Sequence, residues 1–354
     1  MVTRKGWQMV APGQMTRVEE PIGELAAGEA LVRVAGCGVC HTDLGFFYEG
    51  VRTRHPLPLT LGHEIAGFVE AGPADLVGKA VLVPAVIPCG ECVYCRDGQG
   101  GICTRQIFPG NDVHGGFASH VVVPARGLCV VPGCERADQA LGASGVTLPE
   151  LAVIADAVST PWQAAVHADV KAGDVAVVVG AGGVGGYAAQ IALAKGAHTI
   201  AIDVNAARLE AAARHGAIPV DAREPDVKKR VRALVKERGW PDARWKIFET
   251  SGKAAGQQTA WELLVPGAHL GVVGYTRDAS PIRLSNLMAF DATARGTWGC
   301  LPRHYPDILA LVLDGRIDVR SHTETRSLGE LPGVFHAVHH GLVSRRVVLT
   351  PESP

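Results

Sequence analysis

Four closely spaced cysteines constrain this chain more than any other feature. They form the run Cys89-x2-Cys92-x2-Cys95-x7-Cys103, and neighbouring glycines can supply the unusual backbone angles that a tight metal knot needs. Gaps this short allow the backbone to turn and bring four sulfurs to about 2.3 Å from one tetrahedral zinc ion. Four thiolates leave no free coordination position, so we expect this zinc to be structural and the chemistry to lie elsewhere.

The alternative interpretation is two disulfides or four unrelated thiols. The chain has nine cysteines, an odd number that argues against a disulfide framework. The segment Met1 to Gly13 contains no apolar run of signal-peptide length. Reduced cysteines are typical of the cytoplasm, which is the compartment we expect.

Length and charge narrow the class of protein. The chain has 354 residues, enough for about two domains, and a formal net charge of −1 with no basic block. We therefore expect no nucleic-acid partner. No stretch approaches the apolar length of a membrane span, so we expect no membrane partner either.

The second half carries a glycine-rich turn between a strand pattern and a helix pattern. A valine-rich run over 174–179 predicts a buried strand, and an alanine-rich run over 187–195 predicts a helix. The turn between them reads Gly180-Ala181-Gly182-Gly183-Val184-Gly185. Gly180 permits the tight turn, Gly182 lets the backbone approach a pyrophosphate, and Gly185 allows close packing of helix and strand. This context predicts a dinucleotide site rather than an unliganded glycine turn.

Asp203 ends the next expected strand, over 199–202, where an acid binds the hydroxyls of the adenosine ribose. A carboxylate there repels a 2′-phosphate and favours NAD over NADP. Arg208 lies nearby and could instead meet such a phosphate. Both residues belong to the expected cofactor site.

Alternating strand and helix patterns continue beyond Asp203. Helices are expected over 206–215, 226–238 and 255–264, and strands over 246–249 and 269–274. This alternation predicts a doubly wound parallel sheet in an α/β protein. Val273 then lies at the carboxyl end of a strand, where the nicotinamide of a bound cofactor rests.

Two further motifs precede the cysteine knot. They read Gly36-Cys37-Gly38-Val39-Cys40-His41-Thr42-Asp43 and Leu61-Gly62-His63-Glu64-Ile65-Ala66-Gly67. The Cys-x2-Cys-His string alone resembles a c-type haem attachment site, but haem attachment requires export, which nothing else here indicates. Cys40, His63 and one further ligand could instead hold a catalytic zinc with a free coordination position.

Together these motifs resemble the zinc-dependent medium-chain alcohol dehydrogenase family. The resemblance rests on Gly-Val-Cys-His-Thr-Asp, Gly-His-Glu, the four-cysteine lobe and the nucleotide motif, in that order. It implies a mostly-β GroES-like catalytic domain over 1–150 and a Rossmann NAD-binding domain over 151–290. The segment 291–354 would return to the catalytic domain. It also implies two zinc ions per chain and a homodimer or homotetramer, with 270–273 and 286–290 as candidate contacts.

The resemblance also assigns roles to individual residues. Cys40 and His63 match two ligands of the catalytic zinc, and Asp156 falls where many relatives have a third, cysteine ligand. Asp156 as a helix N-cap is the alternative. The remaining matches are Glu64 as a residue that can join the metal, Asp43 as the acid that orients His63, Thr42 as the acceptor of the alcohol proton, Thr160 at the nicotinamide, and His41 and Arg346 near the cofactor pyrophosphate.

One departure concerns the proton exit. Many relatives have a histidine a few residues after the proton-accepting hydroxyl, and here the position is Gly45. The proton must therefore leave through water, the ribose or another side chain such as His41. The hydride chemistry with NAD is not affected by this change.

Several stretches resemble one branch of the family most. They are Trp7-Gln8-Met9-Val10 and the segments 37–47, 109–120 and 123–129. That branch oxidises 6-hydroxycyclohex-1-ene-1-carbonyl-CoA in anaerobic benzoyl-CoA breakdown, so the expected partner is a cyclic acyl-CoA thioester. A further hypothesis is that water near the zinc adds to the enone product. The alternatives are a general secondary-alcohol or polyol dehydrogenase and, more remotely, a non-catalytic nucleotide-binding protein.

Overall fold

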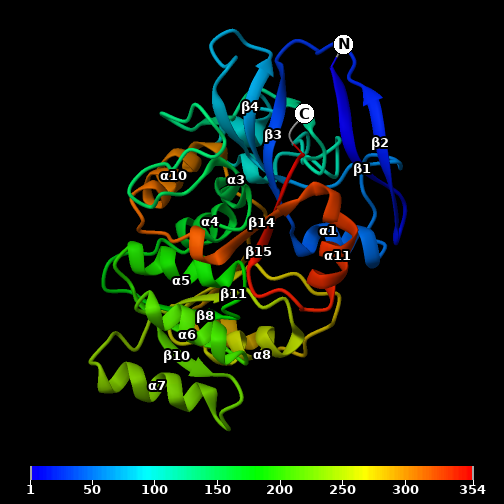
Figure 1. The fold of residues 1–354 in the computed structure, drawn as a ribbon. Coiled ribbons are helices and arrows are strands. Elements are labelled where there is room, and N and C mark those ends of the chain that lie inside the picture. Colours follow the sequence, from blue (N-terminus) through cyan, green and yellow to red (C-terminus); the bar gives the residue numbers. More distant parts are fainter. Residues whose placement is uncertain (1, 353–354) are drawn as a thin grey trace. The chain divides into compact units, whose positions relative to one another are not determined.

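The computed structural model describes residues 2–352, which divide into two compact units (Figure 1). The catalytic unit runs to Ser159 and resumes at Gly299, and the nucleotide unit is Thr160–Trp298. The units therefore divide after Ser159 and Trp298, whereas the sequence suggested divisions after 150 and 290. The reason is that helix α3 (Leu148–Leu151) and the 3-10 turn η2 (Ala152–Ala155) pack on strands of the catalytic unit, which no change in composition revealed.

The catalytic unit is built mainly from β-strands. Strands β14, β15, β3, β4, β5 and β7 follow one another in a sheet, β6 pairs with β3, and β1 and β2 form a separate hairpin. All pairings are antiparallel except that of β14 with β15. The bounds are β1 (Thr3–Ala11), β2 (Gln14–Pro21), β3 (Glu29–Gly38), β4 (Glu64–Ala71), β5 (Ala80–Val83), β6 (His120–Pro124), β7 (Cys129–Val130), β14 (Thr323–Ser327) and β15 (Arg346–Thr350).

The end of the chain completes this sheet. Val348 and Leu349 of β15 pair with Gly38 and Cys37 of β3, so the red and blue strands lie side by side in Figure 1. Helices of the unit are α1 (His41–Tyr48), α2 (Val93–Arg96), α3, α10 (Tyr305–Leu313) and α11 (Leu331–His339). The ring of Phe335 on α11 meets those of Phe47 and Phe117 edge to face inside the core. The C-terminal return is therefore part of the core beneath α1.

The nucleotide unit contains a six-stranded parallel sheet in the order β10-β9-β8-β11-β12-β13. Its strands are β8 (Val175–Val179), β9 (His198–Asp203), β10 (Ile218–Asp221), β11 (Lys246–Glu249), β12 (His269–Val272) and β13 (Thr293–Gly296). Its helices are α4 (Ser159–His167), α5 (Gly185–Ala194), α6 (Ala206–Arg214), α7 (Val227–Glu237), α8 (Ala254–Glu262) and α9 (Ser285–Phe290). The doubly wound sheet is confirmed.

Two strands of this sheet were missed from the sequence. Strand β10 contains a proline and β13 reads Thr-Ala-Arg-Gly, so neither shows an apolar run. Strand β13 pairs with the outer edge of β12. The stretch 270–273 therefore lies in an inner strand and cannot be the sheet edge that the sequence suggested for subunit contact. All four residues of β13 are exposed, so this strand occupies the edge instead.

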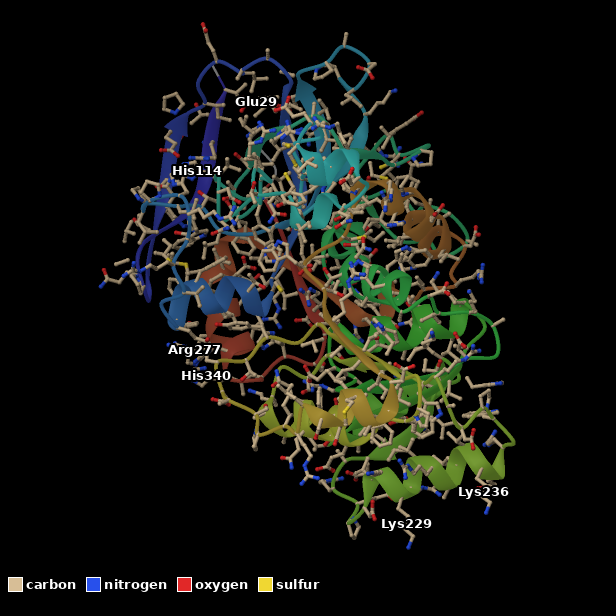
Figure 2. All side chains as sticks on the ribbon, turned by 180° about the vertical axis from the view of Figure 1, so that it is seen from behind. Glu29, His114, Lys229, Lys236, Arg277 and His340 are labelled. Atoms are coloured by element: carbon tan, nitrogen blue, oxygen red, sulfur yellow. The ribbon has the colours of Figure 1, made fainter. Side chains whose placement is uncertain are left out.

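Helix α7 shows how local sequence places an element. The Asp226 side chain accepts a hydrogen bond from the Lys229 backbone N–H at 2.8 Å and caps the helix. Val231, Leu234 and Val235 form its buried face, and Lys229 and Lys236 point outward in Figure 2. Among residues 2–352, no helix combines the length and apolar character that crossing a bilayer requires.

Candidate active site and metal centres

Asp43 organises the start of helix α1. Its Oδ2 accepts a hydrogen bond from the backbone N–H of Cys40 at 3.0 Å, as the acid of a capping box does. Strand β3 ends two residues before Cys40, and the cap turns the chain from that strand into the helix. The Cys40 thiol is thereby held at the helix N-terminus.

The second oxygen of Asp43 positions His63. Asp43 Oδ1 lies 3.2 Å from His63 Nδ1 and accepts from the Gly62 backbone N–H at 3.1 Å. Both side chains are fully buried. A carboxylate at Nδ1 selects the tautomer with its proton there and leaves the Nε2 lone pair free. The contact is the one that the predicted role of Asp43 requires.

Asp156 completes the group from the end of η2. Its Oδ2 lies 3.7 Å from Cys40 Sγ and 3.4 Å from His63 Nε2. The preceding carbonyl, of Ala155, accepts hydrogen bonds from Tyr305 at 2.6 Å and Ser159 at 3.1 Å. Burial raises the pKa of Tyr305 well above its usual value, so this phenol remains a donor. Tyr305 and Ser159 thus anchor the turn that presents Asp156.

These residues fit a metal ion. One ligand atom each from Cys40, His63, Glu64 and Asp156 lies within 4.8 Å of the others. His63 Nε2 is buried and makes no hydrogen bond within the described chain, as expected of a nitrogen that faces a metal. Burial alone lowers the pKa of His63, yet Asp43, Asp156 and Cys40 together raise it well above its usual value. The site therefore favours a cation, and its donors suit zinc.

Glu64 already has a counter-charge from the C-terminal strand. The guanidinium of Arg346 contacts both Glu64 oxygens at 2.7 Å, and Glu64 Oε1 also accepts from the Ala157 N–H at 2.9 Å. The sequence assigned Arg346 to the cofactor pyrophosphate and did not reveal this partner. Burial raises the pKa of Glu64, and the arginine opposes that effect. Gly38 beside them has no room for a Cβ, because Glu64 Oε2 would meet it.

Other expected residues lie around this cluster in the catalytic unit. The Cys40 thiol lies 3.6 Å from the Thr42 hydroxyl, which places Thr42 beside this candidate metal cluster. His41 is the exposed first residue of α1. The ring of Phe108 lies 4.9 Å from that of His63 and was not anticipated from the sequence. Phe108 and Tyr305 carry no local motif that could have identified them.

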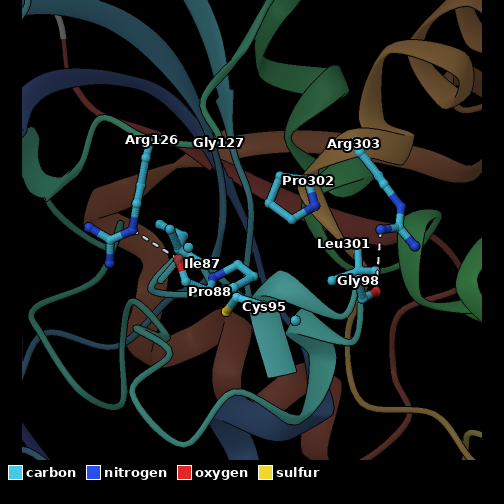
Figure 3. A pocket seen from close by; sticks show the side chains of 11 residues that line it. Ile87, Pro88, Cys95, Gly98, Arg126, Gly127, Leu301, Pro302 and Arg303 are labelled. Carbon is cyan, nitrogen blue, oxygen red and sulfur yellow. Dashed lines mark hydrogen bonds between the residues drawn. The ribbon is translucent and has the colours of Figure 1, made fainter. Parts of the chain in front are cut away.

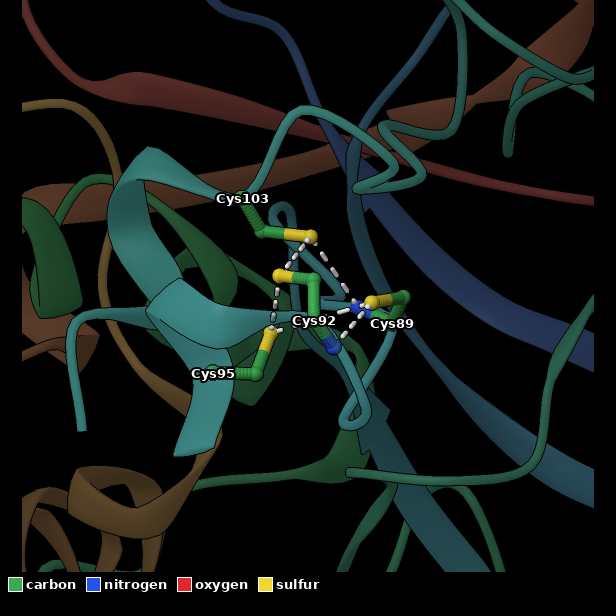
Figure 4. Close-up of side chains that lie close together, drawn as sticks. All are labelled: Cys89, Cys92, Cys95 and Cys103. Carbon is green, nitrogen blue, oxygen red and sulfur yellow. Dashed lines mark hydrogen bonds between the residues drawn. The ribbon is translucent and has the colours of Figure 1, made fainter. Parts of the chain in front are cut away.

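The four knot cysteines approach one another as predicted (Figure 4). Sulfur–sulfur distances are 3.4 Å for Cys92–Cys95, 3.7 Å for Cys92–Cys103 and 3.8 Å for Cys89–Cys95. A tetrahedron with metal–sulfur bonds of about 2.3 Å has edges of about 3.8 Å, whereas a disulfide needs about 2.05 Å. The geometry matches a zinc knot and excludes disulfides.

Electrostatics of the knot point to a metal as well. The backbone N–H groups of Glu91 and Cys92 lower the pKa of Cys89 to about 6. Desolvation, with the neighbouring thiols, raises the pKa of Cys95 to about 12. The Cys89 thiolate therefore forms readily at neutral pH, whereas that of Cys95 needs a cation to neutralise its charge.

An open cavity of about 240 Å³ adjoins the knot (Figure 3). Arg126 and Arg303 line it and donate to the carbonyls of Pro88 at 2.8 Å and Gly98 at 3.3 Å. Neither guanidinium forms an ion pair with a carboxylate of residues 2–352. Both charges are therefore available to an anion.

The nucleotide unit contains the predicted glycine turn. A Cβ on Gly180, whose φ is +94°, would meet Ser251, and one on Gly185 would meet the Gly180 carbonyl. Gly182 has open space apart from the guanidinium of Arg208 about 3.6 Å away. The turn is thus closed where strand and helix pack and accessible where a phosphate would approach. Gly183 is exposed, and Val184 leads directly into α5.

The Asp203 carboxylate forms hydrogen bonds at the glycine turn and just after β9. Its oxygens accept from the backbone N–H groups of Ala181 at 2.7 Å and Asn205 at 2.8 Å. Arg208 Nη1 lies 3.7 Å from Asp203 Oδ2. Val273 donates its N–H to the Glu249 carbonyl at 2.9 Å, beside the carboxyl end of β11. Thr160, on α4, is largely buried.

Comparison with known proteins agrees with this arrangement. Residues 26–133 match the alcohol dehydrogenase GroES-like domain, and residues 183–314 match the zinc-binding dehydrogenase family. An alcohol dehydrogenase of Geobacillus stearothermophilus is 30% identical over 342 residues, 95% of each chain. Sorbitol dehydrogenase of Bacillus subtilis is 28% identical over 72% of this chain and 70% of its own. An alcohol dehydrogenase from Thermus sp. ATN1 superposes with a TM-score of 0.85 at 28% identity, over 98% of this chain and 100% of its own.

The chain belongs to the zinc-dependent medium-chain alcohol dehydrogenase family. It is an oxidoreductase that acts on CH–OH groups and uses zinc and NAD(P). The expected GroES-like and Rossmann architecture is confirmed.

Zinc content should distinguish the two centres. We expect two zinc ions per chain in the wild type and one in Cys40→Ser, because that change removes a ligand of the buried cluster alone. Asp156→Cys should retain two, since a thiolate is a good zinc ligand. Cys134→Ala, outside both clusters, is the matched control. Elemental analysis after gel filtration measures the stoichiometry, and two zinc ions in Cys40→Ser would contradict the assignment.

Removing Arg346 should destabilise the catalytic unit. Arg346→Ala leaves the buried Glu64 without a counter-charge, which costs about 3–5 kcal/mol of unfolding free energy. The neighbouring exposed Arg345→Ala should change it by less than about 0.5 kcal/mol. The double variant Glu64→Gln/Arg346→Met should recover part of the loss. Urea unfolding measures these differences, and equal effects of the two alanine variants would refute the role of the ion pair.

Proposed function

We propose that the chain oxidises a secondary alcohol with NAD at the cluster formed by Cys40, His63 and Asp156. The observation that carries this proposal is the buried His63 Nε2, which makes no hydrogen bond within residues 2–352 and lies close to the Cys40 thiol and 3.4 Å from Asp156 Oδ2. The Asp156 side chain is 18% exposed, so the cluster is not closed on all sides. An alcohol hydroxyl can therefore approach the metal position.

When bound, zinc supplies a Lewis acid that acidifies an alcohol hydroxyl, and NAD supplies a hydride acceptor. The chain's own residues prepare the site for this chemistry. Asp43 keeps the Nδ1 proton on His63, and Arg346 balances the charge of Glu64. Thr42 beside Cys40 receives the alcohol proton by hydrogen bond. Gly45 has no side chain that could pass that proton on, so water is the proposed carrier.

Sorbitol dehydrogenase among the relatives supports a polyol or simple secondary alcohol as substrate. We propose this general class first. The experiment is NADH formation from a panel of cyclohexanols, linear secondary alcohols and polyols, with and without a zinc chelator. Turnover that the chelator abolishes is expected for at least one class. No turnover by protein that carries two zinc ions would reject this substrate class.

A cyclic acyl-CoA thioester is the second candidate. The resemblance of 37–47, 109–120 and 123–129 to one branch supports it. The two cavity arginines support it as well, since guanidinium groups suit phosphates. Burial raises the pKa of the Cys300 thiol and the Asp156 carboxylate adds to this rise; Cys300 directly precedes Leu301 of the cavity wall. Turnover of 6-hydroxycyclohex-1-ene-1-carbonyl-CoA that falls at least tenfold in Arg126→Ala/Arg303→Ala would support it. Equal turnover by the wild type and the double variant, or no turnover by either, would reject the cavity as a subsite for the thioester.

Addition of water to the enone product belongs to this second candidate. Loss of the enone in the presence of enzyme but without NAD would reveal the reaction. An enone that is stable under those conditions excludes it.

We further propose a homodimer or homotetramer. Support comes from the exposed edge strand β13 and from Leu284 and Met288, whose exposed fractions are 68% and 78%. Light scattering measures the mass, and a monomer at micromolar concentration would refute the proposal.

Coenzyme choice should depend on Asp203. Asp203→Asn removes the charge that repels a 2′-phosphate and leaves Arg208 nearby. A repulsion of roughly 1–3 kcal/mol predicts that the NADP/NAD ratio of kcat/KM rises about ten- to hundredfold. Asp221→Asn, at the end of the adjacent strand β10, is the control and should leave the ratio unchanged. An unchanged ratio in Asp203→Asn would show that this carboxylate does not select the coenzyme.

The hydroxyl of Thr42 should matter for turnover. Thr42→Val keeps the shape and removes the proton acceptor, so kcat/KM should fall roughly 10²- to 10⁴-fold. Thr42→Ser keeps the hydroxyl and should stay within about tenfold of the wild type. Zinc content should be two per chain in both variants. A valine variant as active as the serine variant would remove Thr42 from the proton path.

A further inference from the structure

Three histidines stand at the C-terminal end of helix α11, away from both cysteine-containing clusters in the sequence. They are His336, His339 and the C-cap residue His340. His336 and His340 are four residues apart and therefore share one side of the helix. Their ring centroids are 4.1 Å apart, and both side chains are exposed. Figure 2 labels His340 at this end of the helix.

His339 points to a different neighbour. Its ring stacks on that of Tyr48, the last residue of α1, with centroids 4.3 Å apart. The centroids of His339 and His340 are 5.1 Å apart and their planes are nearly perpendicular. His336 and His340 therefore form a pair, whereas His339 is engaged with α1.

The hydrogen bond of His340 determines which of its nitrogens can bind a metal. His340 Nδ1 lies 2.8 Å from the backbone carbonyl of His336. A carbonyl only accepts, so Nδ1 carries the proton and the Nε2 lone pair remains free. Metal-binding histidines are commonly oriented in this way, with the other ring nitrogen donating to a carbonyl or carboxylate.

The surroundings also favour a cation. The last carbonyls of a helix carry partial negative charge, which attracts positive ions. Helix α11 contains no lysine or arginine that would compete for that position. On its opposite face, Leu331, Val334 and Phe335 are buried in the core, so the two histidines sit on a well-supported helix. Little ordering is then needed when an ion binds.

We propose that His336 and His340 form a surface site for one transition-metal ion, with water completing the coordination. Imidazole ligands suit Zn²⁺, Ni²⁺ and Cu²⁺, and among these Cu²⁺ binds most tightly to a given site. This site is separate from the cysteine knot and from the Cys40 cluster. Because the ion bridges successive turns of α11, it binds the folded helix and stabilises it.

The test uses the holoenzyme with its two zinc ions in place. Calorimetric titration with Ni²⁺ should show one additional site in the wild type. His336→Asn and His340→Asn should each weaken binding at least tenfold, and the double variant should lose the site. His339→Asn is the matched control and should bind like the wild type. Ni²⁺ should raise the melting temperature of the wild type and of His339→Asn, but not of the double variant.

Other results would overturn the proposal. Undiminished Ni²⁺ binding by the double variant would place the ion elsewhere. Equal losses in His339→Asn and His336→Asn would show that the pair has no special role. Circular dichroism of the double variant, unchanged from the wild type, verifies that loss of binding does not reflect unfolding.

Discussion

The bridge made by the Asp43 carboxylate is the interaction on which the catalytic centre depends. One oxygen holds the Cys40 backbone, and the other holds the His63 ring and the Gly62 N–H. It thereby joins the start of α1 to the start of β4, the two segments that carry the candidate metal ligands Cys40 and His63. Because Asp43 is fully buried, its hydrogen bonds face no competition from water. The positions of both ligands follow from this one side chain.

Charge balance explains why the rest of the cluster is arranged as it is. Asp43, Glu64 and Asp156 bring three carboxyl groups to a buried region together with the Cys40 thiol. Arg346 pairs with one of them, and the raised pKa of His63 shows that the others still attract positive charge. A divalent ion satisfies this demand better than a proton does, because it binds several donors at once. Charge balance also favours a divalent ion in the knot, because four thiols lie within 4.8 Å of one another there.

Much of the architecture was predictable from local patterns. The strand at 175–179, the turn at Gly180 and the helix at 185–194 agree with the sequence prediction within a residue or two. The short intervals of the knot cysteines allowed a correct expectation of their convergence, because few backbone paths join residues so close in sequence. Strand β13 was not predictable, since its exposed residues form no apolar run and its place depends on pairing with β12.

The sequence by itself determined the types of side chain that could bind a metal, the glycine turn and the order of the two domains, because each rests on neighbouring residues. Only the tertiary structure decided that Arg346 pairs with Glu64, which is 282 positions away, and that Tyr305 supports the turn before Asp156 from 150 positions away. It likewise decided which histidines of α11 face each other and which one meets Tyr48. Contacts of this kind arise when separate segments pack into one core, and no local pattern records which segments will meet.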